Sequence, residues 1–157
     1  MSRMVRTACL AIAIVATGIA VFAQDGKQPR GKQVNHVTVT HLGQQLEEQH
    51  PWGAIHWLMN NRIDPDAQQT LGIVRIDPGE KNALHLHPNC EELMYILSGG
   101  GSTTVGGKVV TLRPGDLVRI PAGVLHQATA TGREPLIAVI SYSSADRQVI
   151  NYESEHK

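Results

Sequence analysis

Three histidines and one glutamate have the types and the spacing of a metal site. His85 and His87 lie two residues apart, Glu92 follows five residues after His87, and His126 comes later in the chain. In an extended segment, residues i and i+2 project from the same face, roughly 6.8 Å apart. Three imidazoles and one carboxylate suit Mn²⁺, Fe²⁺, Ni²⁺, Cu²⁺ or Zn²⁺ better than Ca²⁺ or Mg²⁺. We therefore predict one divalent transition-metal ion per chain, with coordination positions left open for a small-molecule ligand.

Glu91 is the alternative to Glu92 as the carboxylate ligand. If residues 92–97 form a strand, alternation places Glu92, Met94 and Ile96 on one face and Glu91 on the other. This pattern favours Glu92 as the ligand and predicts that Glu91 faces solvent.

The elements that would position these residues are short strands. Runs of apolar and β-branched residues are separated by turn signals such as Gly106-Gly107, typical of a type I′ hairpin, and Pro114-Gly115. Residues 43–50 are expected to form one or two helical turns before Pro51. The remaining pattern predicts an all-β antiparallel sandwich or barrel. The expected strands are 34–40, 54–59, 71–76, 84–87, 92–97, 102–105, 108–112, 117–120, 124–130 and 136–142.

The charge distribution limits the kinds of binding partner, and the N-terminal segment indicates the compartment. Of 157 residues, 14 are basic and 14 acidic, and the basic ones are scattered, which argues against nucleic acid and membrane surfaces. Arg3 and Arg6 precede an uncharged apolar stretch over 7–23 that resembles a signal peptide cut before Gln24. An uncleaved membrane anchor is the alternative. We expect an exported protein, periplasmic or extracellular, with no stable membrane contact after cleavage.

The expected organisation has four parts. Residues 1–23 are the signal peptide, 24–33 a flexible polar leader, 34–145 one folded domain, and 146–157 a polar tail with little to bury. After cleavage Cys90 is the one cysteine left, so the mature chain has no internal disulfide. Cys90 is either a reactive thiol near the metal or a small buried hydrophobe.

The residues around the histidines resemble the two sequence motifs of the cupin superfamily. The positions that match are Gly79, His85, His87, Glu92, Gly99, Gly115, Pro121, Gly123 and His126. The chain departs from the second motif at Ala130, where the family often has Asn. The resemblance implies a jelly-roll β-barrel, preceded by a short irregular or helical segment, with the metal held inside by His85, His87, Glu92 and His126. Within the metals above, it favours Mn²⁺ or Fe²⁺.

The resemblance to germin-like and oxalate-processing cupins also implies a function. It indicates an exported metal-dependent enzyme that acts on a small oxygen-rich or carboxylate substrate, as an oxidoreductase such as a dioxygenase or as a carboxy-lyase. The alternative is a non-catalytic module that binds a small ligand or a metal, because no evident acid or base stands beside the ligands. A homodimer is also implied, formed by pairing of the segment 34–40 with a neighbouring sheet edge.

Three residues are candidates for contact with the substrate. Asn82 occupies a place that faces the substrate in these relatives, although it can equally cap a turn. Arg75 is a carboxylate clamp if it points into the barrel, or a packed outer residue if it does not. Tyr142, like His56, is either a proton shuttle or a structural residue.

Overall fold

A computed structural model describes residues 37–44 and 47–152 of the chain. The predicted signal peptide and leader, residues 1–33, lie outside this part, as do 34–36, 45–46 and 153–157. Within the described residues, the one helical element is the short 3₁₀ turn Leu42–Gln44, and everything else is strand, turn or loop. No helix in this part is long and apolar enough to cross a membrane. The all-β prediction is confirmed.

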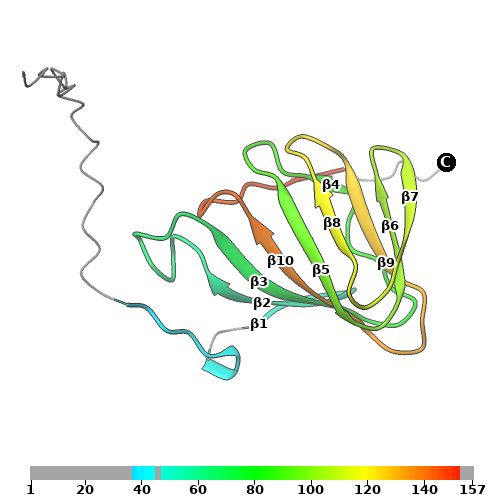
Figure 1. The fold of residues 1–157 in the computed structure, drawn as a ribbon, viewed down its shortest axis with the longest axis horizontal. Coiled ribbons are helices and arrows are strands. Elements are labelled where there is room, and N and C mark those ends of the chain that lie inside the picture. The colour runs from blue at the N-terminus through cyan, green and yellow to red at the C-terminus, as the bar shows by residue number, and fades with distance from the viewer. Residues whose placement is uncertain (1–36, 45–46, 153–157) are drawn as a thin grey trace, which may run out of the picture. The chain divides into compact units, whose positions relative to one another are not determined.

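The strands form two antiparallel sheets that face each other (Figure 1). The six-stranded sheet has the order β1 (Glu47–His50), β2 (Gly53–Met59), β3 (Thr70–Ile76), β10 (Leu136–Tyr142), β5 (Glu92–Ser98) and β8 (Leu117–Ile120). The five-stranded sheet has the order β11 (Ile150–Asn151), β4 (His85–Leu86), β9 (His126–Ala130), β6 (Gly101–Val105) and β7 (Lys108–Leu112).

The core lies between the two sheets and follows the period of two that strands impose. In β3 and β10 every second residue is buried and the residues between them are half-buried. The six-stranded sheet contributes Ile96 and Leu136, and the other sheet contributes Leu112 and Ala130, each with no more than 1% of its surface exposed. Burial of these aliphatic side chains is the main stabilising force of the barrel.

The hairpin between β6 and β7 shows how local sequence determines register. Gly106 and Gly107 both have positive φ, at 55° and 81°, as a type I′ turn requires. The turn pairs Val105 with Lys108 and Gly101 with Leu112. The hairpin predicted from the two glycines is confirmed.

The structure corrects three expectations at the ends of the domain. Within the expected helix 43–50, residues 43–44 belong to the 3₁₀ turn and residues 47–50 form β1, which pairs with β2 across the turn at Pro51 and Trp52. Residues 37–41 have no regular structure, so the described part of the expected strand 34–40 is not a strand. The polar tail contains β11, which pairs with β4, so this segment is part of the barrel.

Candidate metal centre

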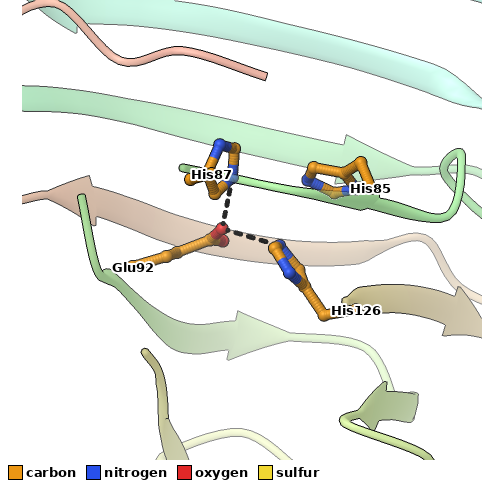
Figure 2. A group of neighbouring side chains, drawn as sticks. All are labelled: His85, His87, Glu92 and His126. Carbon is orange, nitrogen blue, oxygen red and sulfur yellow. Dashed lines mark hydrogen bonds and ion pairs between the residues drawn. The ribbon is translucent and has the colours of Figure 1, made fainter. Parts of the chain in front are cut away.

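Four strand ends bring the three histidines and the glutamate to one place. His85 begins β4, His87 follows that strand directly, Glu92 begins β5, and His126 begins β9. His85 is the register partner of His126 across the β4–β9 pair. Figure 2 shows the four side chains pointing toward one another. The structure therefore brings together all four residues that the spacing singled out.

The donor atoms lie close enough to share a single ion. One ligand atom from each of the four residues lies within 4.8 Å of the others. Glu92 Oε2 is 3.1 Å from His87 Nε2 and 3.2 Å from His126 Nε2. All four side chains are buried, with at most 8% of any of them exposed. The described residues contain no second group of three or more such side chains.

Backbone carbonyls hold each imidazole in one tautomer. Nδ1 of His85 lies 2.8 Å from the Ala83 carbonyl oxygen, and Nδ1 of His87 lies 2.8 Å from the Gln148 carbonyl oxygen. Nδ1 of His126 lies 2.9 Å from the Val124 carbonyl oxygen. A carbonyl oxygen only accepts, so each Nδ1 carries the hydrogen and donates it. In a neutral ring the lone pair is then on Nε2, which is the arrangement of a metal-binding histidine.

The electrostatics favour, at His85 and Glu92, the protonation states that metal binding needs. Burial, assisted by the positive charge of His126, lowers the pKa of His85 to about 4. Burial alone would raise the pKa of Glu92, but hydrogen bonding and charge from His126 and His87 outweigh it and bring that pKa to about 2. At neutral pH His85 is therefore neutral and Glu92 is ionised.

These donors fit a divalent transition metal. Three imidazole nitrogens and one carboxylate oxygen are a mixed set that suits Mn²⁺, Fe²⁺ or Zn²⁺, and the buried Glu92 carboxylate would be neutralised by the ion. The residues that would hold the ion are His85, His87, Glu92 and His126.

A cavity of about 220 Å³ opens beside the histidine group. His85 and Glu92 form part of its wall, and aliphatic side chains such as Val74, Met94 and Ile140 form another part. Besides His85 and Glu92, the polar lining residues are Glu48, His50, Asn82, Tyr142, Arg147 and Asn151. A concave chamber with an aliphatic wall and convergent polar groups is the usual form of a small-molecule site.

Two of the candidate substrate residues line this cavity. Asn82 does so while its Oδ1 accepts from the Ala128 N–H at 2.8 Å, so it also fixes the loop against β9. Tyr142 lies edge-on to His87, with ring centroids 4.9 Å apart. Burial, followed by the charge of Glu92, raises the pKa of Tyr142 well above its usual value, so its hydroxyl stays protonated.

The other candidates lie elsewhere. Arg75 is half-buried on the outer side of β3, forms an ion pair with Asp77 and does not line the cavity, so it lacks the inward orientation a clamp requires. His56 Nε2 lies 3.1 Å from Glu47, also away from the cavity. Glu91 forms an exposed ion pair with Arg119, which confirms its outward orientation.

Residues of the C-terminal segment were missed by the sequence analysis. Gln148 supplies the carbonyl that holds His87, and Arg147, Val149 and Asn151 line the cavity. The one local signal was the β-branched pair Val149-Ile150 within an otherwise polar stretch. Cys90 is buried, as a small hydrophobe would be, and is not disulfide-bonded.

Known proteins resemble parts of this chain in sequence and in structure. Germin-like protein 1 of Brassica napus is 35% identical over 86 residues, which cover 48% of this chain and 41% of the relative. An uncharacterised protein of Methanocaldococcus jannaschii is 29% identical over 100 residues, covering 61% of this chain and 80% of the relative. The crystal structure of Lactobacillus farciminis oxalate decarboxylase in its formate complex superposes with a TM-score of 0.66 at 26% identity. That superposition covers 71% of this chain but 34% of the decarboxylase.

The family model of the cupin domain matches residues 72–142. This range contains β4, β5 and β9, and with them every side chain of the histidine group. Residues 72–142 therefore form a cupin domain, and this domain carries the candidate metal centre.

Proposed function

We propose that this protein is a metal-dependent enzyme that acts on a small carboxylate or oxygen-rich substrate. The observation that carries the proposal is the convergence of three carbonyl-locked imidazoles and the Glu92 carboxylate at the wall of a cavity of about 220 Å³. The similarity to a germin-like protein and to oxalate decarboxylases supports the substrate class. The reaction class we favour is oxidoreduction, including dioxygenation, or carboxy-lyase chemistry, with Mn²⁺ or Fe²⁺ as the metal.

The described residues have defined parts in such a reaction. His85, His87, Glu92 and His126 hold the ion, which when bound supplies Lewis acidity and open coordination positions. Val74, Met94 and Ile140 exclude water from the substrate and strengthen its interaction with charged groups. Tyr142, protonated at neutral pH, offers a hydrogen-bond donor beside the ligand His87.

A second candidate is a non-catalytic cupin that binds a small ligand or a metal ion. The observation that favours it is the state of the ionisable groups in the cavity. The high pKa of Tyr142 makes it a poor proton donor, and the Glu48 carboxylate already accepts from Trp57 Nε1 at 2.6 Å. This candidate predicts a thermal shift on binding of metal and ligand, with no product.

The test combines elemental analysis with turnover. We expect the full chain, purified from its native compartment, to contain one Mn²⁺ or Fe²⁺ per chain, and the His126→Ala variant to contain none. Metal-loaded protein is then assayed against oxalate, flavonols, catechols and dihydroxybenzoates. A purified protein that retains no stoichiometric metal would overturn the proposal. Stoichiometric metal without turnover of any of these substrates would favour the binding module.

We also propose that the protein is exported after cleavage before Gln24. The basic start at Arg3 and Arg6 and the apolar stretch 7–23 support this location. N-terminal sequencing of the protein from the periplasm or the medium should begin at Gln24. A cytoplasmic protein with an intact N-terminus would contradict the proposal.

A homodimer is the assembly we propose. Its support is the outer face of the six-stranded sheet, where Leu93, Tyr95, Leu97 and Leu117 expose between 36% and 60% of their surfaces. Size-exclusion chromatography with light scattering should find a dimer that Leu117→Lys disrupts. Val109→Lys, at an exposed position on the other sheet, is the matched control and should leave the dimer intact. A monomeric wild-type protein would contradict this assembly.

A further inference from the structure

The segment that follows β10 closes one side of the cavity. We call residues 143–152 the strap. Its β11 pairs with β4, the Asn89 side-chain amide donates to the Asp146 carbonyl at 2.6 Å, and the Gln148 N–H donates to Asn89 Oδ1 at 3.0 Å. Because these bonds recur along the strap, the side chain of Arg147 has a defined position between them.

Arg147 is the one arginine or lysine among the described residues that line the cavity, where it joins His85 and Glu92. Its guanidinium carbon lies 4.7 Å from the centre of the Trp57 ring and 5.1 Å from that of Tyr142. Stacking on aromatic faces holds a guanidinium in place while its edge N–H donors remain available for an anion.

Arg147 has no carboxylate partner among the described residues. The acids that share its cavity are engaged elsewhere: Glu48 accepts from Trp57 Nε1 at 2.6 Å and lies 3.1 Å from His50 Nε2, and Glu92 contacts two histidines of the metal centre. A half-buried guanidinium without a counter-ion is suited to bind an anionic ligand, preferably a carboxylate in a bidentate arrangement.

One aromatic ring separates this cation from the histidine group. The Tyr142 ring is 5.1 Å from the Arg147 guanidinium carbon and 4.9 Å from the His87 ring. The cavity, at about 220 Å³, is smaller than the roughly 300–1,000 Å³ typical of drug-sized ligands. A molecule that reaches from the metal centre to Arg147 must therefore be short.

We propose that Arg147 binds the carboxylate of a small substrate whose second oxygen group ligates the ion of the metal centre. The substrate class is thereby a short dicarboxylate, 2-oxo acid or 2-hydroxy acid. The inference deepens the proposed function and rests on it for the metal-bound end of the substrate. The anion-binding role of Arg147 stands on the strap and the cavity alone.

The experiment titrates the full chain, metal-free and loaded with Mn²⁺, with malonate and with its neutral analogue malonamide. The two tryptophans of the chain report binding, because Trp57 lies against Arg147 and Trp52 lines the cavity. Arg147→Gln removes the charge, and Arg147→Lys keeps the charge but loses the bidentate fork. Arg133→Gln, at an exposed position outside the cavity, makes the same charge change and is the matched control. Thermal midpoints and metal content are measured for every variant.

We expect saturable quenching by malonate and none by malonamide. Arg147→Gln should weaken malonate binding by about tenfold or more, Arg147→Lys by less, and Arg133→Gln not at all. Metal content should be unchanged in all variants, because Arg147 is not one of the four converging residues. Equal malonate affinity in the wild type and Arg147→Gln, or no malonate binding by the wild type, would overturn the inference. Arg147-dependent binding in a protein that never retains metal would instead overturn the proposed function and leave the anion site standing.

Discussion

β5 begins at Glu92, among the three histidines, and four residues later reaches Ile96, which is fully buried among aliphatic side chains. β9 likewise runs from His126 to Ala130. The same strands thus build a metal end, formed by the histidine group, and an apolar end, formed by Ile96, Leu112, Ala130 and Leu136. The apolar end requires no ligand, because its side chains pack against one another. The metal end buries a carboxylate and three imidazole rings, whose donor atoms an ion would bind.

This difference predicts that the two ends respond differently to metal. The largest effect is expected at the apolar end, from Leu136→Ala. Leu136 is fully buried, so its truncation leaves a cavity and should lower the free energy of unfolding by about 2–5 kcal/mol. Urea denaturation should give the same loss with and without metal. A loss that depends on metal would mean that the two ends are not independent.

The metal end should gain stability only when the ion binds. At free Mn²⁺ equal to 100 times Kd, the free energy of unfolding of the wild type should rise by about 2.7 kcal/mol. His126→Ala should show no rise under the same conditions, because it lacks one donor of the group. Thermal melts with and without Mn²⁺ measure both. A rise of equal size in the variant would place the ion elsewhere.

The strap supports the metal end through one carbonyl. Asn89→Ala removes the side chain that holds Asp146 and Gln148, loosening the Gln148 carbonyl that orients His87. Metal affinity should fall about tenfold, the size typical of losing support to a metal ligand. Gln148→Ala is the control: its carbonyl remains, so affinity should not change. Calorimetric titration with Mn²⁺ compares the two, and equal affinities would show that the strap does not position His87.

The smallest effect is expected from Glu91→Gln, one residue before the ligand candidate Glu92. Glu91 pairs with Arg119 on the exposed side of the barrel, so its loss should lower the free energy of unfolding by at most about 1 kcal/mol. Metal content should be unchanged, whereas Glu92→Gln should abolish it. Elemental analysis of both variants decides between the adjacent carboxylates, and metal loss in Glu91→Gln would contradict the alternation argument.

Much of this arrangement was predictable from short-range sequence. Runs of apolar and β-branched residues between turn signals predicted β3, β5 and β10, and paired glycines predicted the β6–β7 hairpin, because these signals lie within the element they describe. β1 was mistaken for helix because its four residues, Glu47–His50, are polar and carry no strand signal. Its pairing with β2 provides the hydrogen bonds that define it as a strand, and the residues of β1 alone do not predict that pairing.

The spacing of His85, His87, Glu92 and His126 was enough to single out a four-residue metal centre, because metal ligation restricts both residue type and position. The residues that line the cavity beside this centre became known only from the folded chain. Arg75 lies outward and pairs with Asp77, while Arg147, from a segment expected to be a tail, lines the cavity. The reason is physical. Which face of a strand is inward, and which distant segment covers a cavity, depend on pairings between residues far apart in sequence, and no local pattern encodes them.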